Sequence, residues 1–240
     1  MRQVVLDTET TGLEPSHGHR IIEIGCVEMV DRKLTGNTFH KYINPEDKKV
    51  DQGALEVHGI TDEFLADKPF FADIYDEFLE FVSGSQLIIH NAPFDVGFID
   101  HEISLLEKRL GQTLDTIDVS CSILDSLKLA RDNHPGQKNN LDALCRRYFI
   151  DNSNRQLHGA LLDSEILADV YLAMTGGQTS LSFTDAFGGE GGAEAIRRLD
   201  SNRAALKIQL PSTEEISAHE QFLNLLEKKS GNAPIWRHND

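Results

Sequence analysis

The stretch VVLDTETTGL, residues 4–13, places an apolar run directly before two acidic residues. A β-strand alternates its side chains with period two, so Asp7 and Glu9 project from the same face where the strand ends. Hard divalent cations prefer convergent oxygen ligands of this kind. The stretch therefore predicts a strand of a central sheet that carries part of a metal site.

Two further acidic motifs follow, NAPFD at residues 91–95 and HGALLD at residues 158–163. Asp95 comes just after the apolar run 87–89, which predicts a buried strand; the alternative for Asp95 is a helix N-cap. His158 and Asp163 are five residues apart, which would separate them by about 140° around a regular helix. His158 is therefore predicted in the turn before the helix, where Gly159 permits a bend.

Four carboxylates and one histidine are suited to phosphodiester hydrolysis. In-line attack of water develops charge on the entering and leaving oxygens, and two metals about 3.5–4 Å apart stabilise both. We expect Asp7 to bridge two Mg²⁺ or Mn²⁺ ions, with Glu9 and Asp163 completing one ion and Asp95 acting through the second. An imidazole near neutrality suits His158 for the general base.

Length and composition indicate one α/β domain with a smaller appendage, because 240 residues with 40% hydrophobic content can bury one sizeable core. Three cysteines without a CxxC pair are predicted to be reduced, buried thiols: Cys26, Cys121 and Cys145. No apolar run approaches the length of a membrane span, so we expect a cytoplasmic protein with no membrane partner.

The net charge of -16 sets this chain apart from nucleic-acid binders that rely on Lys and Arg. We expect weak binding of polynucleotide by the chain alone. Two features would compensate, namely divalent metals that neutralise the acidic site and a partner protein that holds the substrate nearby.

Periodicity predicts a mixed central sheet flanked by helices. Three strands come first, at residues 2–7, 20–30 and 38–43. Alternating helices and strands follow, with strands at 87–89 and around Ile117, and with helices at residues 70–82, 94–109, 122–130, 141–148 and 160–174.

The amino-acid composition of the chain changes after Met174. Residues 1–175 are predicted to form the catalytic domain, and the glycine-rich segment 176–210 a flexible linker with a root-mean-square span on the order of 30 Å. Residues 211–240 form a tail in which Ser212 and Glu215 have capping-box spacing before a short amphipathic helix, residues 216–226.

The three motifs, in this order, resemble those of the DEDDh exonuclease family, whose fold is ribonuclease H-like. The resemblance extends over nearly the whole chain to the proofreading members that serve bacterial DNA polymerase III, and it includes VHGI at residues 57–60 and LDALC at residues 141–145. It implies that the 3′-terminal nucleotide is bound by Asp7, Glu9, Thr10, Gly12, Leu13, Gly53, His58 and Asp163. His90 and Asn91 are expected to support the site, and four histidines are expected on the surface: His17, His19, His101 and His134.

The resemblance also implies partners for the tail. The segment QTSLSF, residues 178–183, is similar to peptides that enter the groove of a sliding clamp, through Gln178, Leu181 and Phe183. The polymerase III alpha subunit is expected to bind Phe222, Leu226 and Trp236. A small theta-like accessory subunit is a further expected partner.

We therefore predict a 3′–5′ exodeoxyribonuclease that edits mispaired primer ends. One alternative is an RNA-trimming exonuclease of the same superfamily, which would share every catalytic residue. Another is a catalytically silent adaptor between clamp and polymerase, against which the intact set of acids and His158 argues. The tail distinguishes the proofreading exonuclease from the RNA-trimming alternative, because an RNA-trimming enzyme needs no clamp peptide.

Overall fold

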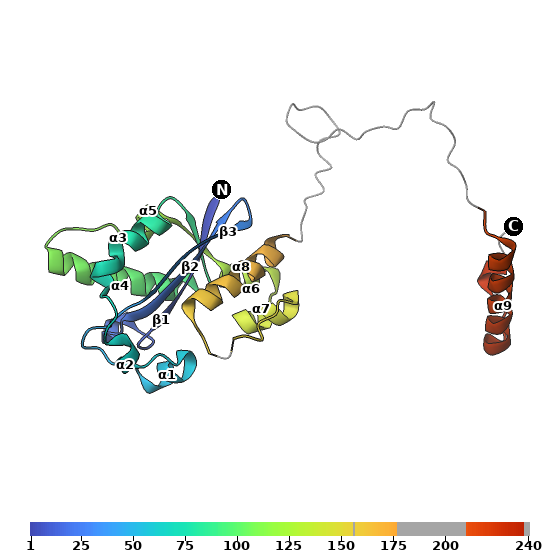
Figure 1. Cartoon of the computed structure of the whole chain (residues 1–240), viewed down its shortest axis with the longest axis horizontal. Helices are drawn as coiled ribbons and strands as arrows, with labels where there is room; N and C mark the ends of the chain where they lie inside the picture. The colour runs from blue at the N-terminus through green and yellow to red at the C-terminus, as the bar shows by residue number, and fades with distance from the viewer. Residues whose placement is uncertain (156, 177–209, 238–240) are drawn as a thin grey trace, which may run out of the picture. The chain divides into compact units, whose positions relative to one another are not determined.

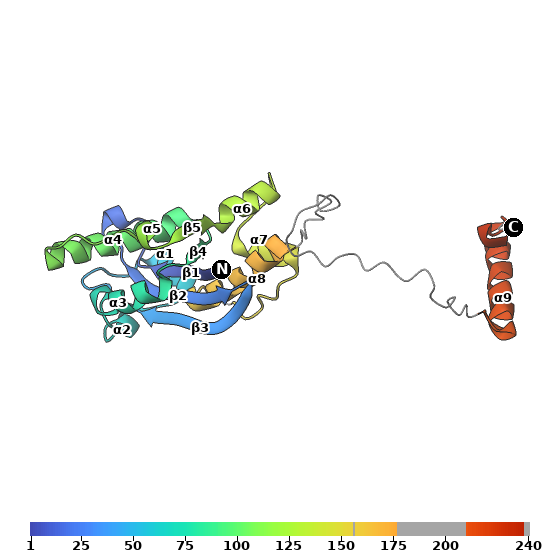
Figure 2. The same cartoon turned by 90° about the horizontal axis from the view of Figure 1, so that it is seen from above.

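The computed structural model describes residues 1–155, 157–176 and 210–237. The chain divides into two compact units, Met1–Ser180 and Leu181–Asp240. The first unit is built on a mixed five-stranded sheet in the order β3-β2-β1-β4-β5, and Figure 2 shows this order from β3 at one edge to β5 at the other. The strands are β1 (Arg2–Thr10), β2 (Ile21–Val30), β3 (Lys33–Tyr42), β4 (Gln86–Ile89) and β5 (Ser122–Asp125).

Helices cover both faces of this sheet because its central strands are apolar on both sides. Val4 and Leu6 pack with helices α3 and α4, whereas Val5, between them, packs with α6, α7 and α8. Helix α8 lies along β1 and β2 (Figure 1). The helices are α1 (Gln52–His58), α2 (Asp62–Leu65), α3 (Phe71–Val82), α4 (Ala92–Leu110), α5 (Ile117–Ser120), α6 (Ser126–Asn133), α7 (Leu141–Tyr148), α8 (Ala160–Gly176) and α9 (Thr213–Ser230), with short 3₁₀ turns η1 (Pro15–His17) and η3 (Ile235–Arg237).

The predicted mixed sheet flanked by helices is confirmed, but two of the predicted elements are wrong. The segment around Ile117 is the short helix α5, and residues 122–130 are strand β5 followed by α6. Helix α6 begins only at Ser126 because the Asp125 carboxylate caps it, accepting hydrogen bonds from the backbone N–H groups of Leu127 and Lys128. Strand β3 starts earlier than predicted, because Asp31 and Arg32 both adopt positive φ and close a two-residue hairpin.

The three cysteines are buried free thiols, as predicted. Two of them belong to the core on the α3 and α4 side of the sheet, and Cys145 lies in the core beneath α8. None of the helices within the described ranges is long and apolar enough to cross a membrane.

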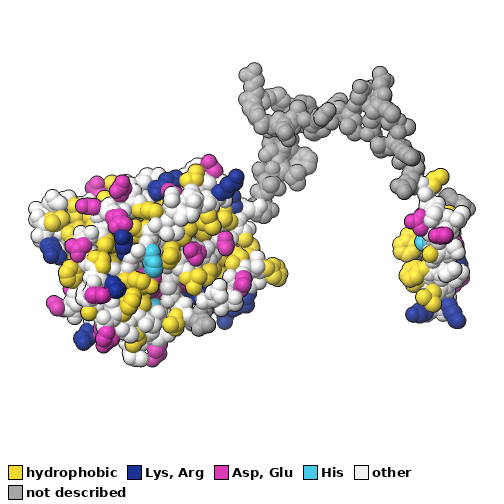
Figure 3. All heavy atoms as spheres, in the orientation of Figure 1, with side chains coloured by type: hydrophobic (Ala, Val, Ile, Leu, Met, Phe, Trp, Pro, Cys, Tyr) yellow, Lys and Arg dark blue, Asp and Glu magenta, His cyan; other side chains and the backbone are white. Residues whose placement is uncertain are grey.

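The second unit contains α9 and the 3₁₀ turn after it. The predicted capping box is present, because Ser212 and Glu215 each accept a hydrogen bond from the other's backbone N–H. Apolar side chains gather along one side of α9 (Figure 3), with Phe222 57% exposed and Leu226 half-buried. Trp236 is 68% exposed. The predicted clamp residues Gln178, Leu181 and Phe183 lie outside the described residues.

Candidate active site

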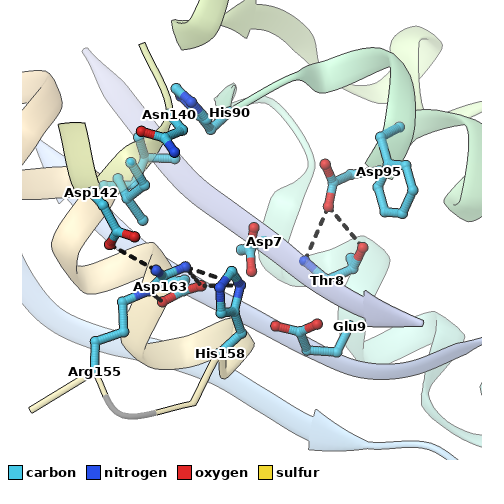
Figure 4. A pocket seen from close by; sticks show the side chains of 13 residues that line it. Asp7, Thr8, Glu9, His90, Asp95, Asn140, Asp142, Arg155, His158 and Asp163 are labelled. Atoms are coloured by element: carbon cyan, nitrogen blue, oxygen red, sulfur yellow. Dashed lines mark hydrogen bonds and ion pairs between the residues drawn. The ribbon is translucent and has the colours of Figure 1, made fainter. Parts of the chain in front are cut away.

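A cavity of about 350 Å³ opens where β1 ends, and all three acidic motifs reach it. Figure 4 shows labelled side chains converging from β1, from α4, from the start of α7, and from α8 and the segment that leads into it. Its lining residues are Asp7, Thr8, Glu9, His90, Phe94, Asp95, Asn140, Leu141, Asp142, Arg155, His158, Asp163 and Leu167.

The unequal lengths of β1 and β4 create this opening. The two parallel strands stay paired only as far as Leu6 and Ile89, so β1 runs on alone on that side. By strand alternation, Asp7 and Glu9 lie on the face that α8 covers. Asp95, from the first turn of α4, enters past the end of β4 and accepts hydrogen bonds from Thr8 N (3.1 Å) and Thr8 Oγ1 (2.7 Å).

These contacts decide between the two interpretations of Asp95. The N-cap of α4 is Asn91, not Asp95. The Asp95 side chain is 3% exposed and its Oδ1 is held by Thr8, so its carboxylate belongs to the cavity.

Helix α8 comes close to the sheet because Gly25 lies beneath its first turn. Gly25 is the residue of β2 opposite Asp7, and a Cβ atom there would lie 2.2 Å from the carbonyl carbon of Ala160. Ser164 donates a hydrogen bond to Gly25 O at 2.9 Å. The missing side chain therefore lets α8 bring Asp163, in its first turn, over Asp7.

His158 lies two residues before α8, as predicted from its spacing to Asp163. Its backbone N–H donates to Val57 O at 3.1 Å, which ties this turn to the end of α1. The imidazole is 45% exposed, and its Nδ1 is 3.5 Å from Asp163 Oδ2. The histidine therefore faces the acidic cavity while remaining open to solvent.

Burial and mutual repulsion favour the protonated forms of Asp7, Glu9 and Asp95 in the metal-free protein. Desolvation, assisted by the neighbouring carboxylates, raises the pKa of Asp7 well above its usual range and that of Glu9 to about 8. Burial likewise raises the pKa of Asp95 to about 7, although hydrogen bonds from Thr8 oppose the shift. Because these carboxylates are costly to ionise, a bound cation would stabilise their charged forms.

The donor set fits divalent cations. One ligand atom from each of Glu9, His158 and Asp163 lies within 4.8 Å of the others, and Asp7 and Asp95 line the same cavity. Carboxylate oxygens are the ligands that Mg²⁺ and Mn²⁺ favour.

Three charged residues at the site were missed from the sequence, namely Glu23, Arg155 and Asp142, the last of which lines the cavity and forms an ion pair with Arg155. Glu23 pairs directly with Glu9 across β1 and β2, is buried, and accepts a hydrogen bond from Ala160 N at 3.2 Å, so it caps α8. Arg155 forms an ion pair with Asp163. Its only signal was that it is the one Lys or Arg between residues 149 and 162.

A second cavity, of about 410 Å³, adjoins the first and shares Thr8, Glu9 and Phe94 with it. Apart from the acids, every residue predicted to bind the terminal nucleotide lines this second cavity. Its lining residues are Thr8, Glu9, Thr10, Gly12, Leu13, Asp51, Gly53, Ala54, Val57, His58 and Phe94. Leu13 is 80% exposed, so it does not belong to the core. The Nε2 atom of His58 is buried and has no hydrogen-bond partner among the described residues.

His19 supports this second cavity, and its prediction as a surface residue is wrong. The ring lies under Gly12, where a Cβ would approach within 2.3 Å of it. Its Nδ1 is 3.0 Å from Thr11 Oγ1 and its Nε2 is 3.4 Å from Asp51 Oδ2. His19 therefore joins the loop after β1 to the start of α1. Of the other three, His17 is exposed, and His101 and His134 are half-buried.

Comparison with known proteins agrees with this geometry. A family model described as "RNase_T: Exonuclease" matches residues 4–171. DNA polymerase III subunit epsilon of Escherichia coli K12 is 53% identical to this chain, and the match covers 98% of this chain and 97% of that protein. The epsilon subunit of Haemophilus influenzae is 50% identical, and the match covers 98% of this chain and 94% of that protein.

Solved structures share the fold. Exonuclease X in complex with 5′ overhanging duplex DNA aligns with a TM-score of 0.56 at 25% identity, over 72% of this chain and 91% of that one. The nuclease domain of 3′hExo, a DEDDh family member bound to rAMP, aligns with a TM-score of 0.60 at 18% identity. The alignment covers 72% of this chain and 90% of that one. The chain belongs to the RNase_T exonuclease family and, within it, to the epsilon subunits of bacterial DNA polymerase III.

Proposed function

We propose that this chain removes mispaired 3′-terminal nucleotides from primer DNA, using two Mg²⁺ or Mn²⁺ ions held by its acidic cavity. Membership of the family makes it a metal-dependent 3′–5′ exonuclease. The observation that carries the proposal is the junction of two cavities: the one with four carboxylates and His158 shares a wall with one suited to a nucleotide.

The chain's own residues divide the chemistry between them. The carboxylates that would hold the cations are Asp7, Glu9, Asp95 and Asp163. Bound cations supply the positive charge that stabilises the attacking and leaving oxygens of a phosphodiester. His158 removes the proton from the attacking water, because burial lowers its pKa and keeps the imidazole neutral near pH 7.

The second cavity would seat the terminal nucleotide. Exposed Leu13 can contact the base, and the loop at Thr10 and Gly12 brings backbone close to it. The Nε2 atom of His58, which has no hydrogen-bond partner in the described part of the chain, remains available for a polar group of the nucleotide, and Gly53 offers only backbone. Binding the last nucleotide beside the acids directs cleavage to the 3′ end.

We further propose three segments with separate partners: residues 1–175 as the exonuclease, 176–210 as a tether whose Gln178, Leu181 and Phe183 bind the sliding clamp, and 211–240 for the polymerase alpha subunit. The exposed apolar residues of α9 and Trp236 support the last assignment. A theta-like subunit would be a fourth component. Tethering within a cytoplasmic replisome gives a chain of charge -16 the local DNA concentration that it cannot obtain by attraction.

Deleting residues 211–240 should release the enzyme from the polymerase. We expect loss of co-elution with purified alpha subunit in size-exclusion chromatography, and at least about tenfold weaker binding for Phe222→Ala or Trp236→Ala. Lys228→Ala, exposed on the same helix, is the matched control. Hydrolysis of a short single-stranded DNA should be unchanged, because the first unit keeps its own core.

The same preparations test the substrate class. If the truncated chain still co-eluted with the polymerase, or digested RNA 3′ ends faster than DNA 3′ ends, the RNA-trimming alternative would replace the proofreading assignment.

Replacing Gly25 by alanine tests whether the approach of α8 builds the site. The new Cβ must push Ala160 away, so we expect a lower melting temperature and a loss of primer digestion of about 10²-fold, the usual cost of a displacement near 1 Å. Gly97→Ala is the control, because a Cβ there meets nothing within 4 Å. Normal digestion by Gly25→Ala would show that Asp163 does not depend on this contact.

A further inference from the structure

Arg155 occupies the acidic cavity in a manner that the proposed hydrolysis does not use. Its side chain is 8% exposed, and it donates to both oxygens of Asp163, from Nε to Oδ1 at 2.5 Å and from Nη2 to Oδ2 at 2.7 Å. Two more contacts complete its surroundings, from Nη1 to Asp142 Oδ1 at 2.9 Å and from Nη2 to His158 Nδ1 at 3.0 Å. Figure 4 shows the guanidinium between these three partners.

This fork competes with a cation for the same carboxylate. Asp163 is buried, and both of its oxygens are engaged by a planar group that carries a full positive charge and cannot be deprotonated. A divalent ion on Asp163 would face that charge at short range, in surroundings where screening is weak. The bidentate pair and a metal ion on Asp163 therefore compete for the same carboxylate.

The contact with His158 also disables the base. An arginine has no acceptor, so Nη2 must donate and His158 Nδ1 must accept. In the neutral imidazole the single proton then lies on Nε2. Neither ring nitrogen is free to accept a proton from water, because one lone pair is bound by Arg155 and the other nitrogen carries a hydrogen.

The positive charge of Arg155 is electrostatically favourable in the acidic cavity when no metal is bound. It is the only Lys or Arg among the residues that line the cavity. Its charge opposes the upward shift in pKa of Asp7 and Glu9. Asp142 on α7 gives the guanidinium a partner outside the carboxylate cluster, with a side chain 43% exposed.

We propose that Arg155 is an internal counter-ion that holds Asp163 and His158 in an inactive, metal-free arrangement and must leave Asp163 before that carboxylate can bind a divalent cation. The inference rests on the proposed function, since it concerns the same metal site. Arg155 is thus a positioning residue that couples metal binding to release of the base.

The test is metal binding by the full-length chain, measured by calorimetric titration with Mn²⁺ alone. Arg155→Ala should bind Mn²⁺ about tenfold more tightly than the wild type, because no cation has to be displaced. Arg155→Lys, which keeps the charge without the fork, should lie between them. Arg146→Ala, an exposed arginine of α7, should match the wild type.

Thermal unfolding provides the second readout. Without metal, Arg155→Ala should melt below the wild type, since the carboxylates lose their compensating charge, and saturating Mn²⁺ should raise its melting temperature by more than it raises that of the wild type. Equal or weaker Mn²⁺ binding by Arg155→Ala would overturn the counter-ion role while leaving the proposed function intact. Absence of Mn²⁺ binding by both proteins would overturn both.

Discussion

Asp7→Asn is expected to reduce 3′-end digestion by about 10³-fold or more while leaving the fold intact. Asp7 lies on β1 opposite Gly25, inside a cavity where burial, and then the neighbouring acids, raise its pKa. The amide keeps the size of the side chain but cannot replace a charged oxygen ligand. The measurement is the initial rate of digestion of a 3′-labelled primer in saturating Mg²⁺.

Stability should move in the opposite direction. Near pH 8 the unfolded chain ionises Asp7 freely, whereas burial and the neighbouring acids oppose that charge in the folded protein, so removing the titratable group should raise the melting temperature of the metal-free protein. Asp47→Asn, at an exposed position, should change neither quantity. Near-normal digestion by Asp7→Asn would eliminate the metal-based mechanism.

His158→Ala is expected to lower the maximal rate by about 10²–10⁴-fold, the usual contribution of a general base. The base acts when neutral, so the wild-type rate should rise with pH through the pKa of His158 and then level off. Burial lowers that pKa below its ordinary value of 6.5, so the midpoint of the rise should lie below pH 6.5. The variant should lose this rise, as measured by primer digestion between pH 5 and 8.

Metal affinity separates a base from a ligand. Mn²⁺ should bind His158→Ala nearly as well as the wild type, because the four carboxylates remain. His17→Ala, whose side chain is 73% exposed, is the control for losing one imidazole. A collapse of Mn²⁺ affinity together with the rate would make His158 a metal ligand.

Those parts of the fold that depend on local pattern could be predicted from the sequence. The alternation along β1 placed Asp7 and Glu9 on one face, and the five-residue spacing placed His158 outside α8. The errors arose where short segments carry ambiguous patterns. Ile117, Val119 and Cys121 alternate as in a strand, but Ile117 N donates to Asp100 Oδ1 of α4, and the segment forms one helical turn.

Long-range contacts explain what the sequence could not reveal about the site. Nothing local distinguishes His19 from a surface histidine, because its burial follows from the approach of Gly12 and Asp51. Glu23 follows the apolar alternation of β2, and its role depends on α8, 137 residues later. Arg155 lies between motifs, and only the folded segment brings it to Asp163.

The docking of α8 onto β1 and β2 also bears on how this enzyme comes into being. Strand β1 cannot complete its packing until α8 has been synthesised and has docked onto it. Contacts between segments so far apart in the sequence form slowly, because loop closure must precede them. A chain still emerging during synthesis already has Asp7, Glu9 and Asp95 but lacks both Asp163 and the base. Under the proposed mechanism, hydrolysis would begin only when folding of the first unit is complete, and a partly synthesised chain would leave nucleic acid intact.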